Sequence, residues 1–371
     1  METKWDATDS LRDFACRLYG ALDRTRNLFF SPHSVSAAMS LAYAGAKGRT
    51  AAQLAAALSY QADDPETTPA LMALASLPDN GEIRMSAANA AWVQRGYAIL
   101  DDYRRKLGDL FRETDFALAD AASAEINRWI AEHTNDLIRD LVPPEALGAM
   151  TRLVLVNAIH FKGAWQRPFE ADITHKADFH CLDGRTVKTD MMVANEVPTR
   201  HLATPEFEAA YLPYGDGSMS MLVIVPKDFE RFSAEFDGAR LRTLQSGLNG
   251  ASRIDVDLRL PKFKLESTLE LSRVLVDLGA EDAFALGAAD FSGITGNREL
   301  FISSVLHKAL VDVSEEGTEA AAATAVVARC FDMGKTVRFE VNRPFIFAIC
   351  RNGLRPLSGG APLFMGQVIA L

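Results

Sequence analysis

Apolar residues near the start of the chain recur at helical spacing. A first helix is predicted by the series Leu11, Phe14, Leu18 and Leu22. Ser31 before Pro32 places a capping residue ahead of a first-turn proline, which predicts a second helix that ends near Gly45. Thr50 and Gln53 form a capping-box pattern and predict a short third helix. A longer amphipathic helix is predicted by the series Ile126, Trp129, Ile130, His133 and Leu137.

After residue 150 the apolar pattern becomes that of β-strands. The nearly unbroken apolar run 153–159 predicts a strand buried on both faces, whereas alternating apolar and charged residues over 254–260 predict a half-exposed strand. Further strand-like runs occupy 219–225, 337–341, 345–350 and 363–370. One late helix is predicted among these strands, with Ser267 and Glu270 as its capping box and Gly279 as its stop.

The order of these elements indicates the fold class. Helices come first and strands later, without the regular βαβ alternation of a parallel sheet. No fixed-period repeat and no linker rich in Gly, Ser or Pro divides the chain. We therefore predict one α+β domain that spans residues 1–371.

Composition and charge exclude several classes of partner. The 371 residues are 48% hydrophobic and 24% charged, as in an ordinary globular protein. With 39 Lys+Arg against 49 Asp+Glu, the net charge of −10 leaves no basic face for nucleic acid or anionic lipid. No apolar stretch is long enough to cross a bilayer, and the first residues lack the pattern of a secretory signal. We predict no nucleic-acid or membrane partner and favour the cytoplasm, with secretion open if the chain is a trimmed mature form.

Motifs for catalysis and metal binding are absent from the sequence. It contains neither the GxSxG elbow of a serine hydrolase nor the HExxH motif of a zinc protease. Gly334-Lys335-Thr336 ends like a phosphate-binding loop, but Arg329 occupies the position that needs the first glycine. Neither CxxC spacing nor a disulfide framework is formed by Cys16, Cys181, Cys330 and Cys350. We therefore predict that the protein is not an enzyme and holds no metal or cofactor.

The most informative segment lies between two strand-like runs and consists mainly of small residues. It reads Glu315-Glu316-Gly317-Thr318-Glu319-Ala320-Ala321-Ala322-Ala323-Thr324. The segment lacks the bulky anchors of a core strand and the glycine and proline content of an ordinary loop. By composition alone, a short Ala-rich surface helix is an equally good interpretation.

In its wider context this segment resembles the reactive-loop hinge of inhibitory serpins, a family of serine protease inhibitors. The resemblance extends over essentially the whole chain in the family's order. It includes Asn27-Leu28-Phe29-Phe30-Ser31-Pro32-His33-Ser34, Asn157-Ala158-Ile159-His160-Phe161-Lys162-Gly163-Ala164-Trp165, Leu260-Pro261-Lys262, His307-Lys308-Ala309, Asn342-Arg343-Pro344-Phe345 and Leu363-Phe364-Met365-Gly366. It implies the serpin fold, with three β-sheets (A, B and C), eight or nine helices and an exposed reactive-centre loop at about 315–341.

The resemblance also implies a mechanism of inhibition, suicide-substrate trapping. A protease attacks the loop as a substrate. After acylation the freed hinge inserts as a new strand into sheet A, which carries the acyl-enzyme to the far pole and distorts its active site. The extended chain from Gly317 to Phe331 covers about 48 Å at about 3.4 Å per residue, enough to cross most of the molecule. Because insertion is favourable, the uninserted state must be a kinetic trap, that is, a metastable fold.

Small hinge residues suit this mechanism because every second side chain must enter a packed groove. The positions expected to face inward are Thr318, Ala320, Ala322 and Thr324, with Ala321 and Ala323 between them. Gly317 gives the backbone freedom where the turn begins, and we expect Thr318 to enter the sheet at the step that starts insertion. The rival interpretation, a non-inhibitory serpin that acts as a carrier or interaction protein, usually shows a bulky, charged or proline-bearing hinge. Here only Glu319 is of that kind, and it occupies a position expected to face outward.

By the same resemblance, two groups of residues support the opening of sheet A. The shutter, beneath the centre of the sheet, comprises polar residues that exchange hydrogen bonds as the strands part: Ser31, Ser34, Asn157 and His307. The breach, at the end of the sheet where insertion begins, comprises Trp165 and an ion pair between Lys262 and Glu315. The contribution of that ion pair should be modest if it is exposed.

The expected position of the scissile bond follows from spacing within the family. Seventeen residues counted from Glu315 lead to Phe331, so Phe331–Asp332 is the preferred bond. A chymotrypsin-like serine protease is then the preferred target, and we expect the inhibitor to act as a monomer.

Other bonds remain open. Counting back from the segment 342–344 leads to Met333 instead, because the distal side of the loop is about two residues longer than usual. Arg329–Cys330 would suit a trypsin-like enzyme, and cysteine proteases are an alternative target class. The thiol of Cys330 would be exposed to oxidation in such a loop.

Overall fold

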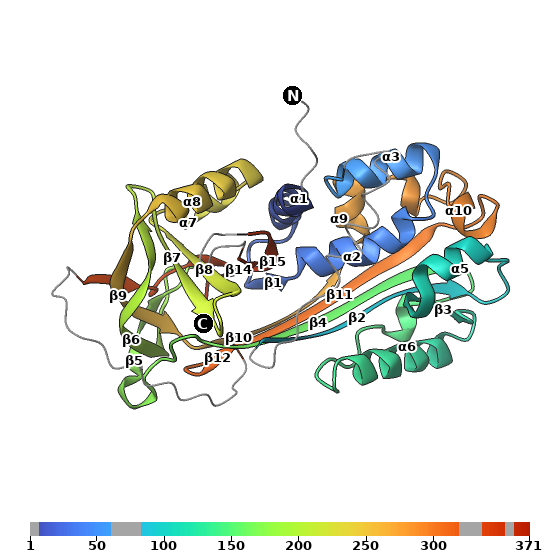
Figure 1. Ribbon diagram of the computed structural model, residues 1–371. Helices are drawn as coiled ribbons and strands as arrows, with labels where there is room; N and C mark the ends of the chain where they lie inside the picture. Colours follow the sequence, from blue (N-terminus) through green and yellow to red (C-terminus); the bar gives the residue numbers. More distant parts are fainter. Residues whose placement is uncertain (1–6, 61–82, 319–335, 353–359) are drawn as a thin grey trace, which may run out of the picture.

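A six-stranded sheet, sheet A, extends across much of the molecule (Figure 1). The computed structural model describes residues 7–60, 83–318, 336–352 and 360–371. In spatial order the strands of sheet A are β10 (Phe263–Glu270), β11 (Ile302–Val313), β12 (Gly317–Thr318), β4 (Leu153–Ala164), β2 (Ile83–Gln94) and β3 (Phe111–Thr114). Strands β11 and β4 pair directly and in parallel over most of their length. At their C-terminal ends the short strand β12 lies between them and pairs with both.

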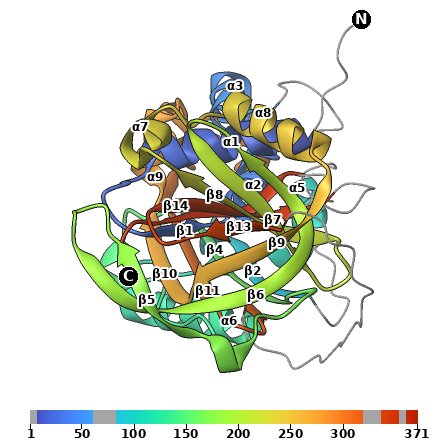
Figure 2. The same ribbon diagram turned by 90° about the vertical axis from the view of Figure 1, so that its left-hand side faces the viewer.

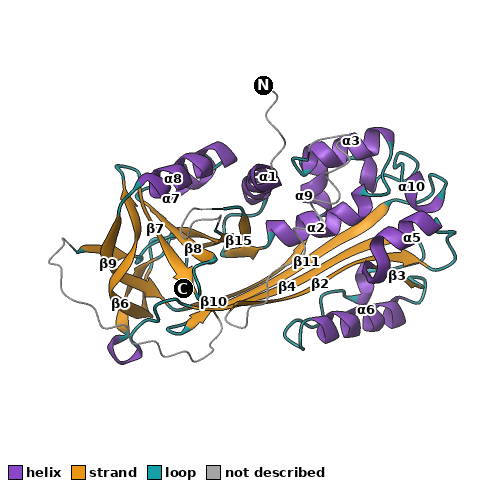
Figure 3. Ribbon diagram, viewed as in Figure 1, coloured by secondary structure: helices purple, strands orange, loops and turns teal. Residues whose placement is uncertain are grey.

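The other strands form a continuous nine-stranded array, drawn toward the left in Figure 3, beside one end of sheet A. Sheet B comprises β1 (Leu28–Phe30), β15 (Pro362–Val368), β14 (Phe345–Arg351), β8 (Met219–Pro226) and β7 (Phe207–Tyr214). Sheet C comprises β5 (His175–His180), β6 (Thr186–Ala203), β9 (Arg253–Pro261) and β13 (Val337–Glu340). The last residues of β6 pair with β7, which joins the two predicted sheets into one hydrogen-bonded array.

Nine α-helices occur among the described residues, in agreement with the eight or nine expected. They are α1 (Ala7–Ala21), α2 (Pro32–Tyr43), α3 (Gly48–Ala57), α5 (Asp101–Leu107), α6 (Ala119–His133), α7 (Phe229–Ala234), α8 (Gly238–Gly250), α9 (Ser272–Asp277) and α10 (Ser292–Thr295). Helices α2 and α6 lie on opposite sides of sheet A (Figure 1), and α1, α7 and α8 lie above sheets B and C (Figure 2). Within the four described segments, no helix has the length and apolar character needed to cross a membrane.

Two apolar cores lie on opposite faces of sheet A. Successive side chains of a strand point to opposite faces, so β4 contributes to both cores. Leu155 and Ile159 join the larger core, which also contains side chains of α1, α2 and sheet B. Val154 and Val156 join the smaller core with side chains of α6. The prediction that this strand is buried on both faces is confirmed.

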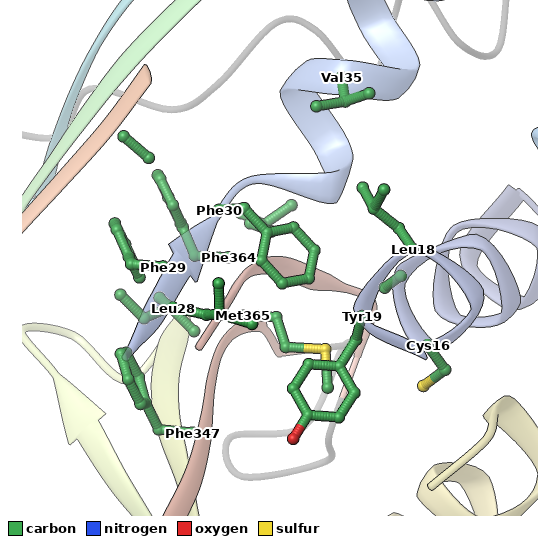
Figure 4. Close-up of a cluster of buried hydrophobic side chains, with 14 of the residues drawn as sticks. Cys16, Leu18, Tyr19, Leu28, Phe29, Phe30, Val35, Phe347, Phe364 and Met365 are labelled. Atoms are coloured by element: carbon green, nitrogen blue, oxygen red, sulfur yellow. The ribbon is translucent and has the colours of Figure 1, made fainter. Parts of the chain in front are cut away.

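The centre of the larger core is aromatic (Figure 4). The ring of Phe29 on β1 stacks with that of Phe347 at 5.8 Å and with that of Phe364 at 5.3 Å between centroids. Nearby, the hydroxyl of Tyr19 on α1 donates to Oε1 of Gln367 at 2.7 Å. These contacts pack β1 against β14 and β15 within sheet B and attach α1 to that sheet.

Two predicted capping boxes were wrong. Ser267 lies inside β10, where its hydroxyl accepts the N–H of Phe29 at 3.1 Å, and helix α9 begins only at Ser272. Thr50 lies inside α3, where its hydroxyl accepts the N–H of Asp290 at 2.9 Å. In both cases a residue distant in sequence took the hydroxyl that the local pattern assigned to a helix start.

The predicted order of helices first and strands later was also incomplete. Strands β2 and β3 lie in the first half of the chain, and helices α7 and α8 lie in the second half. Much of β2 consists of alanine and polar residues, so it carries little of the hydrophobic alternation that marks a strand. Helix α8 was not predicted, although its sequence carries a helical apolar stripe: Leu241, Leu244 and Leu248.

Candidate functional site

The hinge begins inside sheet A. In β12, which is antiparallel to both of its neighbours, Gly317 lies opposite Ala164, and Thr318 lies opposite Gly163 of β4 and Val313 of β11. From the sequence, Thr318 is expected to enter the sheet at the step that starts insertion. The structure corrects this expectation, because Thr318 is already paired with both strands in the uncleaved chain.

The side chain of Thr318 is fully buried. Its Oγ1 forms a hydrogen bond of 2.7 Å with the hydroxyl of Tyr214, the last residue of β7. The Tyr214 ring in turn stacks on Trp165, with 4.4 Å between centroids and an interplanar angle of 11°. Burial raises the pKa of Tyr214, so the hydroxyl stays protonated. Each hydroxyl therefore satisfies a buried polar group that would otherwise lack a partner.

The backbone of β4 leaves no space for a side chain at Gly317. A Cβ atom at this position would lie 2.2 Å from the carbonyl oxygen of Gly163 and 2.7 Å from Cα of Ala164. Backbone freedom is the reason for glycine at position 317 that the sequence predicts. The close approach of the two backbones is a second reason for glycine here.

Trp165 ties the residues before β12 to the end of β4. Its indole Nε1 donates to the carbonyl of Ser314 at 2.9 Å, and its backbone N–H donates to the carbonyl of Glu316 at 3.0 Å. A third bond runs from the N–H of Phe169 to the carbonyl of Glu315 at 2.8 Å. Residues 314–316 are thus held by three bonds to the chain that follows β4.

The predicted pair of Lys262 and Glu315 is formed. Lys262 Nζ lies 2.8 Å from Oε2 of Glu315, and the hydroxyl of Thr174 donates to Oε1 at 3.0 Å. The Glu315 side chain is 14% exposed and that of Lys262 is 41% exposed, so water screens the pair on the lysine side. Burial raises the pKa of Glu315, but the hydrogen bonds, first of all that from Lys262, outweigh burial and hold this pKa below its ordinary value.

A chain of polar side chains crosses the centre of sheet A. Asn89, Asn157 and His307 lie directly opposite one another on the neighbouring strands β2, β4 and β11. The side-chain amide of Asn157 donates to Oδ1 of Asn89, and Oδ1 of Asn157 is bonded to Nδ1 of His307. Nε2 of His307 accepts the backbone N–H of Ser31 at 3.1 Å, which places the imidazole proton on Nδ1.

Ser31 joins this chain to the start of α2. Its hydroxyl donates to the carbonyl of Leu363 at 2.7 Å and accepts the N–H of Ser34 at 3.1 Å, the geometry of an N-cap. The predicted start of this helix is therefore confirmed. Ser34 Oγ is buried and has no hydrogen-bond partner among the described residues.

Burial controls the charge of the shutter. His307 is fully buried, and this burial lowers its pKa to about 3. The imidazole is therefore neutral at neutral pH, as its acceptor role toward Ser31 requires.

Comparison with known proteins identifies the family. The model of the family described as "Serpin (serine protease inhibitor)" matches residues 9–371. The chain belongs to the serpin family. Among its relatives, "Ipis-1" of Ixodes persulcatus is 37% identical over 97% of this chain and 98% of its own length. "Leukocyte elastase inhibitor A" of Mus musculus is 35% identical over 96% and 97%, and "Serine protease inhibitor" of Cyanea capillata is 34% identical over 92% of each chain.

Solved serpin structures share the whole fold. Serpin48 of Tenebrio molitor superposes with a TM-score of 0.86 at 28% identity, over 100% of both chains. Uncleaved ovalbumin superposes with a TM-score of 0.85 at 25% identity, over 98% of this chain and 99% of its own. The predicted α+β serpin fold is confirmed.

The described residues of this serpin contain only part of the predicted site. The breach and shutter residues and the start of the hinge lie where given above. Outside the described residues lie the rest of the hinge and the candidate scissile bonds: Ala320, Ala321, Ala322, Ala323, Thr324, Arg329, Cys330, Phe331, Asp332 and Met333.

Sequence reasoning missed three residues of this serpin's site. Asn89 extends the shutter to β2, Tyr214 holds Thr318, and Thr174 donates to Glu315. Asn89 could have been noticed as a polar residue within the run Ala87–Ala91, which is otherwise composed of alanine. Tyr214 and Thr174 carry no local signal, because their partners lie 104 and 141 residues away.

Proposed function

We propose that this serpin inhibits serine proteases by suicide-substrate trapping, in which cleavage of the loop is followed by insertion of the hinge into sheet A. The observation that carries the proposal is the position of β12. Gly317 and Thr318 already occupy the first two places of a strand between β4 and β11. Below them β4 and β11 are parallel neighbours. A longer inserted strand would replace this one parallel interface with two antiparallel ones, which are more stable per residue.

The pairing of β12 defines the register of the inserted strand. In antiparallel pairing, each step forward along the hinge is one step back along both neighbours. Thr318 lies opposite Gly163 and Val313, so Thr324 would lie opposite Asn157 and His307. The strand would reach Leu153, the first residue of β4, at Ala328.

This register gives the polar side chains of the shutter a role in the proposed mechanism. The hydrogen bond between Asn157 and His307 spans the gap that must open, and both residues are buried. Its loss without replacement would leave buried polar groups unpaired. Thr324 lies six residues after Thr318, so in an extended strand both side chains point to the same face, toward α2. There the hydroxyl of Thr324 can donate to one of these groups and accept from the other.

We further propose Phe331–Asp332 as the scissile bond and a chymotrypsin-like serine protease as the target. If the inserted strand ends near Ala328, Phe331 would lie just beyond the start of β4, where an attached protease remains outside the sheet. The names of two relatives, leukocyte elastase inhibitor and serine protease inhibitor, support this class of partner. In this proposal the chain supplies a bond to be cleaved and performs no catalysis.

A protease panel tests the proposal. The full chain is incubated with chymotrypsin-like and trypsin-like serine proteases and with a cysteine protease, and the products are separated on denaturing gels. We expect a covalent complex with the chymotrypsin-like enzyme and a released peptide that begins at Asp332. The matched control is the same protease without its nucleophile, which should form no such complex. A peptide that begins at Cys330 or Gly334 would move the bond to Arg329 or Met333 but leave trapping intact.

Cleavage that leaves the protease fully active would overturn trapping. Thermal melting of the cleaved chain then separates the remaining alternatives. A clear rise of the melting temperature after cleavage indicates insertion into sheet A, whereas an unchanged melting temperature indicates a non-inhibitory serpin that acts as a carrier or interaction protein.

A further inference from the structure

A cleft lies outside the hinge, the breach and the shutter, and shares no residue with them. Its volume is about 660 Å³, within the range of small-molecule sites. Four segments line it: residues 24–27 between α1 and β1, the turn between β5 and β6, helix α7, and residues 369–370 after β15. The cleft is therefore large enough for a ligand and is built from several elements.

Arg24 is held in a fixed orientation in this cleft. Its Nη1 donates to the carbonyl of Ser233 on α7, and its guanidinium carbon lies 5.9 Å from the centre of the Tyr19 ring. Its own carbonyl accepts the side-chain amide of Gln367 at 2.8 Å. The backbone and the guanidinium of Arg24 are thus both preorganised. Binding an anion would therefore cost little conformational entropy at this residue.

Arg24 also differs from the other two arginines of the cleft in its charge partners. Arg26 lies 3.4 Å from Asp23, and Arg185 lies 2.7 Å from Asp183. Arg24 has no carboxylate within 4.0 Å among the described residues. Of the three, Arg24 is the one whose charge is available to a bound anion.

The remaining lining residues define the rest of the ligand. Leu182, Phe229 and Ile369 provide apolar surface in the same cleft. Glu230 is exposed on α7 and also lines the cleft, so a second negative charge on the ligand would be repelled. Together the residues favour one negative charge on an apolar body.

We propose that this cleft binds a small amphiphilic monoanion, with its carboxylate on Arg24 and its apolar body against Leu182, Phe229 and Ile369. A guanidinium has five N–H donors, so Arg24 can keep its bond to Ser233 and still donate to a carboxylate. This binding is independent of loop insertion, because none of the lining residues belongs to the hinge, the breach or the shutter.

Decanoate is the probe for this site, with the neutral decanol as its uncharged counterpart. Titration of the full chain, followed by calorimetry below the micelle concentration, should show one saturable decanoate site with a Kd below about 1 mM. Decanol should bind at least about tenfold more weakly, because a charge-assisted hydrogen bond is lost. An absence of saturable decanoate binding would overturn the proposal.

Arg24→Gln should weaken decanoate binding about tenfold or more. The matched control is Arg26→Gln, which removes an exposed arginine of the same cleft that already has a partner, and should change the Kd less than about twofold. Equal losses in the two variants, or no loss in Arg24→Gln, would also overturn the proposal. Ala234→Trp fills the cleft from an exposed position on α7 and should block binding with Arg24 intact, so the test does not depend on the folding of Arg24→Gln.

Discussion

The hydroxyl groups of Thr318 and Tyr214 lie 2.7 Å apart in the buried interior between sheets A and B. This bond joins the start of the hinge to β7, while the backbone of Thr318 pairs with β4 and β11. Thr318 is thus held by strands β4 and β11 on either side and by β7 on one face of sheet A. The first two residues of the proposed inserted strand are therefore already paired before cleavage.

Replacing Thr318 by Arg should convert the proposed inhibitor into a substrate. The site is fully buried, so an unpaired guanidinium there would cost about 3 kcal/mol or more. Because Thr318 already lies in the sheet, this cost should expel β12 from between β4 and β11, and insertion would have to start without its first two residues. Each added 1.4 kcal/mol on the insertion barrier slows insertion about tenfold relative to deacylation. The measurement is the number of inhibitor molecules consumed per protease molecule inactivated, which should rise strongly. Glu316→Arg is the control, because Glu316 is exposed two residues earlier; equal ratios for the two variants would contradict the prediction.

Gly317→Ala should loosen β12 without adding charge. The new Cβ would lie 2.2 Å from a backbone oxygen of β4, and relieving this overlap should cost about 1–3 kcal/mol. Hydrogen exchange over residues 314–318, measured by mass spectrometry, should therefore become faster. Gly148→Ala is the matched control, since a Cβ at Gly148 meets no atom within 4 Å. Unchanged exchange in Gly317→Ala would show that β12 adapts to the extra atom.

Lowering the pH below about 6.5 should destabilise the native state because of His307. Its pKa is about 3 in the folded chain and about 6.5 when unfolded. Below pH 6.5 the unfolded chain binds a proton that the native state does not, so this contribution is complete above pH 6.5 and is lost as the pH falls toward 3. At pH 5 the loss should be about 2 kcal/mol.

The urea midpoint near neutral pH and near pH 5 measures this effect. His307→Gln keeps a side-chain donor and acceptor but does not titrate, so the difference between wild type and variant should narrow as the pH falls. Parallel pH profiles of the two proteins would show that another group causes the loss. The first unfolding transition is the one to compare, because the proposed native state is metastable.

Lys262→Met should destabilise the breach only slightly. Lys262 is 41% exposed, so the loss should stay below about 1 kcal/mol. The pKa of Glu315 should rise toward its ordinary value. Because this pKa is lowered in the folded chain, the contribution of the pair is present above the ordinary pKa and lost as the pH falls through the folded value.

Lys264→Met is the matched control for the breach pair. Lys264 lies 3.3 Å from Asp312 on the neighbouring strand, and both side chains are exposed. The urea midpoints of both variants should differ little from wild type, but only Lys262→Met should raise the pKa of Glu315 in an NMR titration. An equal pKa of Glu315 in Lys262→Met and Lys264→Met would contradict the ion pair between Lys262 and Glu315.

The sequence was sufficient to predict those parts of the fold that depend on burial along one strand. The apolar run in β4 and the alternation in β9 both follow from the period of two in a strand, and the structure confirms both. Family motifs also placed Asn157 and His307 near each other, because each motif carries its residue to a defined strand. These signals are local or follow the order of the chain.

The contacts that hold the hinge could not be predicted in the same way. Thr318 meets Tyr214 because the end of β7 lies beside the end of β4, where Tyr214 forms a β-bridge with Trp165. Nothing in the sequence near either residue indicates that partner. The hydroxyl groups of Ser267 and Thr50 were misassigned for the same reason, since distant N–H groups took them. Short polar side chains have several possible partners, and the tertiary fold selects among them.

The position of β12 means that the nucleus of the new strand exists before any protease arrives. When a strand inserts between two others, the first residues are the slowest to enter, because chain entropy is lost before many contacts form. With Gly317 and Thr318 already in place, the proposed insertion becomes a zipping process that advances one residue at a time. The side-chain hydrogen bond between Asn157 and His307 is a polar contact that this process must break. In the proposed mechanism, whether insertion is faster than deacylation of the protease is therefore decided at the middle of sheet A and not at the end where β12 already lies.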